Sequence, residues 1–116
     1  MIEKTINIKT LDEDTIIIDP GSQLDNSNAH EMVEIIAGAQ ARGHKYLIVD
    51  MHNLEFLSSS GVGAIIGSVE VSREAGGDII LCNVSETISN ILRVLDLVDF
   101  LTIRSDTEDA LKTCNL

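Results

Sequence analysis

The stretch "FLSSSGVGAIIG", residues 56–67, decides the interpretation of this chain, because three serines meet a glycine where an apolar helical pattern begins. After the glycine, apolar residues recur at three- and four-residue steps: Val62, Ile65, Ile66 and Val69. One serine is enough to cap such a helix at its N-terminus. On spacing alone, plain capping by Ser58, Ser59 or Ser60 is the better explanation of the triplet, and a serine exposed for modification is the alternative.

Strands and helices alternate along the rest of the chain. Apolar patterns predict five strands, at residues 5–9, 15–19, 46–51, 78–84 and 100–103. Four helices are predicted between them, from 28 to 43, from the serines to Gly76, from 85 to 95 and from 105 to 111. The order ββαβαβαβα predicts an α/β fold with a mixed, mostly parallel sheet and its first strand at an edge. Without repeats or linkers, residues 1–116 are expected to form a single domain.

Three of the predicted helices carry a capping signal at their start. Asn28 with Glu31 and Ser105 with Glu108 have the spacing of a capping box, and Ser85 precedes the third helix. The loops "PGSQLDN" and "HNLEFLSSSG" both leave the carboxyl ends of predicted parallel strands and enter helices. Such loops share one edge of the sheet, so we expect Asp25 to lie near the serines. Asp25 is equally well explained as the N-cap of the first helix.

Composition limits the classes of partner. The formal net charge is -11, from 19 acidic and 8 basic residues, which opposes binding to nucleic acid and to anionic membranes. The acidity fits a basic protein partner, or serves only to keep the domain in solution. Apolar runs are too short to span a membrane, and the first ten residues lack the apolar core of a secretory signal. Cys82 and Cys114 lack metal-ligand spacing, so we expect reduced thiols and a cytoplasmic protein.

From about residue 5 to residue 111 the chain resembles a STAS domain of the anti-sigma factor antagonist type. The resemblance is carried by "GSQLD", "YLIVDMHNLEFLSSSGVGAIIG" and "GGDIILCNVSETISNILRVLDLVDFLTI". It implies that Ser60, directly before the glycine, is the phosphorylation site, with Ser59 as the preceding motif serine. It also implies that Asp25 and Asp50 occupy the acidic positions of the family. Ser58 stands where the family often has Asp, and Gly21 lies one residue early in its loop.

The resemblance also implies a function. Members of that family have no catalytic machinery and need no cofactor of their own. The unphosphorylated form binds an anti-sigma factor that is also a serine kinase, which frees a sigma factor. The kinase then uses its own ATP to phosphorylate the serine and end the binding, and a serine phosphatase resets the switch. The residues expected to contact the partner are Asp25, Ser58, Ser59, Gly61 and Val62, with Gly61 letting the partner approach the backbone.

The apolar residues before the serines and the three histidines each have to be considered for a functional role. Leu54, Phe56 and Leu57 could contact a partner, although closing the core explains Phe56 and Leu57 better. An esterase is not expected, because the G-x-S-x-G elbow is absent and His30, His44 and His52 lack a triad context. His44 is most simply explained as solvated.

Two functions other than a diffusible antagonist stay open. Gly61, Gly63 and Gly67 lack the spacing of a nucleotide-binding loop, and close packing of the helix on the sheet explains them better. The resemblance still allows a scaffold or a nucleotide- or ligand-binding subunit of a larger signalling or transport assembly.

Overall fold

Five strands form the main sheet of the computed structural model, which describes residues 6–114. In chain order they are β1 (Asn7–Thr10), β2 (Thr15–Asp19), β4 (Tyr46–Asp50), β6 (Asp78–Cys82) and β7 (Thr102–Arg104). They lie side by side in that same order, and each neighbouring pair is parallel except β1 with β2. The predicted α/β fold, mostly parallel with its first strand at an edge, is therefore confirmed.

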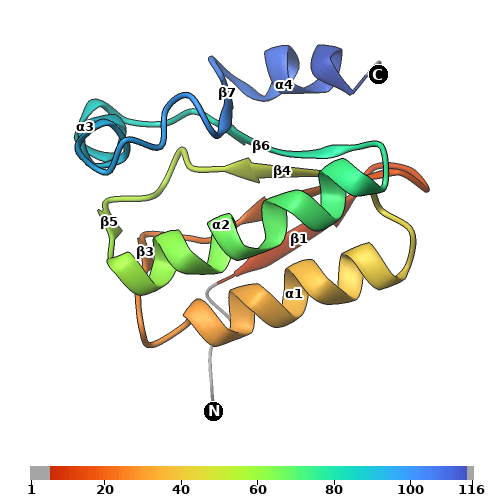
Figure 1. Ribbon diagram of the computed structural model, residues 1–116, viewed down its shortest axis with the longest axis horizontal. Helices are drawn as coiled ribbons and strands as arrows, with labels where there is room; N and C mark the ends of the chain where they lie inside the picture. Colours follow the sequence, from red (N-terminus) through yellow and green to blue (C-terminus); the bar gives the residue numbers. More distant parts are fainter. Residues whose placement is uncertain (1–5, 115–116) are drawn as a thin grey trace.

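Helices cover both faces of this sheet. Within the described residues they are α1 (Ala29–Ala41), α2 (Ser59–Glu74), α3 (Glu86–Val94) and α4 (Thr107–Thr113). Helices α1 and α2 pack together on one face, and α4 lies on the other (Figure 1). Helix α3 lies at the end of the molecule where α2 begins. The sheet therefore separates two cores.

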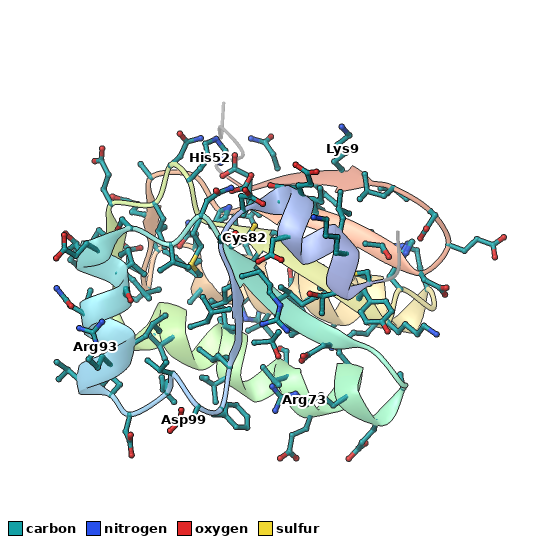
Figure 2. The ribbon with its side chains drawn as sticks, turned by 90° about the horizontal axis from the view of Figure 1, so that it is seen from above. Lys9, His52, Arg73, Cys82, Arg93 and Asp99 are labelled. Atoms are coloured by element: carbon teal, nitrogen blue, oxygen red, sulfur yellow. The ribbon has the colours of Figure 1, made fainter. Side chains whose placement is uncertain are left out.

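The central strands are apolar at nearly every position because both of their faces are buried. Leu47, Val49, Ile79 and Leu81 pack in the larger core with α1 and α2, whereas the alternating residues Ile48, Ile80 and Cys82 pack against α4. This two-residue alternation follows from the pleat of a strand. Figure 2 shows Cys82 in the middle of the molecule, beside α4.

Two very short strands escaped the sequence patterns. Strand β3 (Gln23–Leu24) pairs in parallel with β5 (Phe56–Leu57), so Leu24 lies opposite Leu57. Two residues are too few to show a period of two, which is why no pattern predicted them. The pair joins the loop after β2 to the loop after β4, and α2 begins directly beyond it.

The last strand begins two residues later than predicted. The N–H groups of Phe100 and Leu101 both donate to the carbonyl of Leu97, at 3.1 and 3.0 Å, and so close a turn. Pairing with β6 therefore begins only at Thr102. Arg73 holds the turn against α2 by donating to the Phe100 carbonyl at 2.6 Å and to Asp78 at 3.0 Å.

Two of the three predicted caps are wrong in detail. The N-cap of α4 is Asp106, whose carboxylate accepts from the Asp109 N–H at 2.8 Å, while Ser105 donates to the Asp109 carboxylate. Asn28 precedes α1 but turns its side chain back to the loop, where it accepts from the Asp25 N–H and donates to the Gln23 carbonyl. Ser85 caps α3 as predicted, accepting from the Ile88 N–H at 3.2 Å.

Candidate functional site

The three serines divide their roles at the start of α2. Ser58 is the N-cap: its backbone is extended, and its hydroxyl oxygen accepts from the Gly61 N–H at 3.2 Å. Ser59 and Ser60 are the first two residues of the helix and are exposed. Within residues 6–114 neither of these two hydroxyls has a hydrogen-bond partner. Capping therefore accounts for one serine only.

The position of Ser60 suits a negatively charged group. The first N–H groups of a helix have no partner within it, and the helix dipole adds a partial positive charge there. A phosphoryl group on the Ser60 oxygen would lie at this end of a helix of 16 residues, where anions are stabilised. The first half of α2 carries no charged side chain that would oppose it.

Gly61 is required by the fold. It is buried, and a Cβ at this position would lie 2.4 Å from the carbonyl oxygen of Leu24. The same carbonyl accepts a hydrogen bond from the Ser58 N–H at 3.0 Å, which ties the start of α2 to β3. The absent side chain therefore makes room for β3. A part of Gly61 in partner binding stays a prediction.

Asp25 lies beside the serines, as expected. It follows Leu24 and Ser58 follows Leu57, and these two leucines are paired across the short sheet. Oδ1 of Asp25 accepts from the hydroxyl and the N–H of Ser27, at 2.5 and 2.9 Å. These two hydrogen bonds, the one from the hydroxyl first, lower the pKa of the Asp25 carboxyl below its ordinary value. The carboxylate orders its own loop, so the hypothesis that Asp25 is the N-cap of α1 is wrong.

An apolar groove of about 400 Å³ runs between the start of α2 and α3. Its apolar lining consists of Leu57, Val62, Ile91, Val94 and Leu95. Ser58, Ser59 and Asn90 contribute the polar part of the lining. Val94 is 84% exposed and Leu95 is 47% exposed.

The α3 side of this groove differs from what the sequence pattern indicates. The three- and four-residue spacing of Ile88, Ile91, Leu92 and Leu95 predicts one apolar stripe facing the core, but only Ile88 and Leu92 of the helix are buried. Phe56 also differs from its preferred explanation, since it is 55% exposed while Leu54 and Leu57 are buried.

Asp50 has a structural environment away from the serines. Its Oδ1 accepts from Asn83 Nδ2 at 3.0 Å and from the backbone N–H of His52 at 3.1 Å, and His52 Nδ1 lies 3.0 Å away. Asn83 also lies 3.5 Å from the Thr107 hydroxyl at the start of α4, so this network faces the α4 side of the sheet. Asp50 holds the turn after β4.

The other two histidines show no catalytic arrangement. His30 pairs with Glu34 at 3.1 Å on the surface. His44 is not simply solvated: its Nδ1 is buried and lacks a hydrogen-bond partner within the described structure. None of the three histidines hydrogen-bonds to a serine or cysteine side chain in residues 6–114.

Within residues 6–114, no group of three or more His, Cys, Asp or Glu residues is arranged to hold a metal ion. No helix in the described part of the chain is long and apolar enough to cross a bilayer.

Comparison with known proteins gives the family and the fold. The STAS domain family model matches residues 5–110. The chain is 22% identical to the anti-sigma-B factor antagonist of Staphylococcus aureus over 104 residues, which are 89% of this chain and 96% of that protein. The structure superposes on the unphosphorylated anti-sigma factor antagonist SpoIIAA with a TM-score of 0.83 at 20% identity, over 96% of this chain and 97% of that one. A sulfate transporter family protein from Wolinella succinogenes is also similar, with a TM-score of 0.78 at 15% identity over 92% and 89% of the two chains.

Proposed function

This chain belongs to the STAS domain family, and on that premise we propose that it is an anti-sigma factor antagonist switched by phosphorylation of Ser60. The unphosphorylated form binds an anti-sigma factor that is also a serine kinase, and a sigma factor is freed. Phosphorylation ends the binding, and a serine phosphatase restores it. The similar proteins named as antagonists of anti-sigma factors support this choice of partner.

The observation that carries the proposal is the division of roles among the serines. Ser58 caps α2, and the exposed Ser60 hydroxyl has no hydrogen-bond partner within residues 6–114. A kinase can therefore reach this oxygen, and modifying it breaks no hydrogen bond of the fold. The helix N-terminus stabilises the new negative charge.

The chemistry of the switch belongs to the partner. Oγ of Ser60 attacks the γ-phosphorus of ATP bound to the kinase, the bond to the β-phosphate oxygen breaks, and ADP leaves. The serine proton passes to a base of the kinase. This chain supplies the acceptor oxygen and no cofactor. The phosphoryl group adds about 1.5 to 2 negative charges at pH 7.

Added charge at Ser60 ends binding through the surface around it. Asp25 is ionised beside the serines, and a cationic group of the partner would match it. Ser58, Ser59, Gly61 and Val62 complete the proposed contact. A phosphoryl group both fills space and places a second anion in this surface, so a partner shaped for the unmodified form loses its fit.

Mass spectrometry tests the proposal directly. The protein is incubated with ATP and extract from its native cells, beside Ser60→Ala and the matched control Ser59→Ala. We expect one added phosphoryl group on Ser60 in the wild type and in Ser59→Ala, and none in Ser60→Ala. Modification that persists in Ser60→Ala would move the switch to another serine. An unmodified wild-type protein would count against the switch altogether.

A second function has one observation in its favour, the similarity to the sulfate transporter family protein. In that case the domain is a subunit of a larger signalling or transport assembly. Size-exclusion chromatography with light scattering separates the two functions, because a scaffold subunit forms a high-mass species and a diffusible antagonist does not.

A further inference from the structure

Asn28 stands at the start of α1, but its side chain does not serve that helix. It occupies the N-cap position and makes no capping hydrogen bond. Its amide turns back to the preceding loop: Oδ1 accepts from the Asp25 N–H at 3.0 Å, and Nδ2 donates to the Gln23 carbonyl at 2.9 Å. Asn28 is buried, although the two residues before it are exposed. A residue that could stabilise α1 therefore holds residues 23–25 instead.

A single peptide group carries this contact to the start of α2. The N–H of Asp25 and the carbonyl of Leu24 belong to one planar trans peptide, so they point in opposite directions. Oδ1 of Asn28 binds the N–H side of this group. The carbonyl side accepts from the Ser58 N–H at 3.0 Å, next to the space left by Gly61. Fixing the N–H of the peptide therefore also fixes the oxygen that anchors α2.

We propose that Asn28 is a positioning residue of the Ser60 switch, which holds the start of α2 through the peptide between Leu24 and Asp25. The inference rests on the proposed function and extends it to a residue outside the serine motif. Phosphoryl transfer needs the attacking oxygen in line with the γ-phosphorus, and a displacement of about 1 Å can slow such a step about a hundredfold. Ser60 lies in the first turn of α2, so the direction of its hydroxyl depends on the anchor at Ser58.

The same contacts fix the acidic loop relative to the helix. The N–H groups of Asn28 and Ala29 donate to the Asp25 carbonyl at 3.2 and 2.8 Å, so both sides of the Asp25 backbone are held from the start of α1. Strands β3 and β5 pair over two residues each beside the start of α2 (Figure 1). So short a pair is weak by itself. Asn28 therefore supplies a second connection between the Asp25 loop and the serines.

Asparagine provides both loop contacts with one side chain, since its amide has an acceptor and a donor at the same distance from the backbone. Serine could cap α1, but its single short hydroxyl cannot replace both contacts. Asparagine at residue 28 is therefore explained by the loop and not by the helix it precedes.

The variant Asn28→Ser separates these two roles, because serine can still cap α1 while the contacts to the loop are lost. The matched control is Asp106→Ala, which removes the cap of α4 on the other face of the sheet. Full-length wild type and both variants are incubated over a range of concentrations with ATP and extract from the native cells. The temperature is chosen so that thermal unfolding shows all three fully folded. Mass spectrometry measures initial rates of Ser60 phosphorylation, and NMR measures hydrogen exchange of the Ser58 amide.

We expect Asn28→Ser to lower the phosphorylation rate at saturating protein concentration about tenfold, and Asp106→Ala to change it less than about twofold. A loss of stability alone leaves the saturating rate unchanged while the protein is folded, so this rate separates positioning from a merely structural role. The Ser58 amide should exchange about tenfold faster in Asn28→Ser than in the wild type and the control, because its acceptor is no longer fixed.

Two kinds of result would overturn the inference. Equal saturating rates in Asn28→Ser and the control, or a change confined to the half-saturating concentration, would show that Asn28 does not position the acceptor hydroxyl. Unchanged exchange of the Ser58 amide in Asn28→Ser would break the link through the peptide. A wild type that gains no phosphoryl group on Ser60 would refute the switch instead, and the Ser58 amide would still decide whether Asn28 holds the start of α2.

Discussion

Replacing Gly61 by alanine should destabilise the protein, although alanine is the better helix former. The new Cβ would lie 2.4 Å from the Leu24 carbonyl oxygen, where ordinary contacts begin near 3.4 Å, so α2 and β3 must separate by about 1 Å. Overpacking of this kind costs about 1–3 kcal/mol. Stretching the hydrogen bond from the Ser58 N–H to Leu24 costs up to about 1 kcal/mol more. Helix propensity returns about 0.5–1 kcal/mol, which leaves a net loss of about 1–3 kcal/mol.

The same helix offers matched controls. A Cβ at Gly63 or Gly67 meets open space, so each Gly→Ala change should stabilise the protein by about 0.5–1 kcal/mol. Thermal unfolding followed by far-UV circular dichroism measures all three variants. At about 4 °C per kcal/mol for a chain of this size, Gly61→Ala lowers Tm by about 4–12 °C and each control raises it by about 2–4 °C. A Gly61→Ala protein as stable as Gly63→Ala would refute the contact between α2 and β3.

Three further predictions concern the caps, the thiols and the acidic loop. Ser58→Ala should lower the free energy of unfolding by about 1 kcal/mol because the cap is lost, whereas Ser60→Ala should stay within about 0.5 kcal/mol of the wild type. Urea titration measures both variants, and equal losses would contradict the assignment of Ser58 as the cap. Burial raises the pKa of both Cys82 and Cys114 to about 11, so iodoacetamide at pH 8 should modify them only after urea is added, and rapid labelling of the folded protein would be inconsistent with their burial. Because folding lowers the pKa of Asp25, its stabilising contribution is complete above about pH 4 and is lost as the pH falls through the folded-state value. The stability difference between wild type and Asp25→Asn should therefore shrink below about pH 4 in unfolding experiments, and a difference independent of pH would exclude this role.

The strand and helix order was predictable because the patterns are long. Runs such as 46–51 and 78–84 are buried on both faces, and the amphipathic helices around them have several turns to reveal their period. What could not be predicted depends on pairings between distant segments. The two-residue strands β3 and β5 exist only because Leu24 and Leu57 lie opposite each other.

The candidate site shows the same limit. The spacing before Gly61 marked the serines, but only the contact with Leu24 shows why residue 61 is glycine. The capping signals pointed to Ser105 and Asn28. In the structure Asp106 caps α4 instead of Ser105, and the side chain of Asn28 accepts from the Asp25 N–H of the preceding loop instead of capping α1. The spacing pattern predicts a buried Leu95, yet this residue is exposed in the wall of the groove. A pattern of apolar residues gives the period of a helix more clearly than it shows which side of the helix packs against the core.

The different roles of the serines determine which substitutions the start of α2 can accept. Position 58 needs only an oxygen that accepts from one N–H, so Asp, Asn or Thr could replace serine there with little change in the cap. Position 61 accepts a side chain only at a cost in stability, because a Cβ there meets the Leu24 carbonyl. Position 60 makes no hydrogen bond to the rest of the described fold through its hydroxyl, so it can gain or lose a modifiable oxygen without a structural penalty. If Ser60 is the proposed switch, a single substitution at residue 60 is enough to turn a switched module into a permanent binding module.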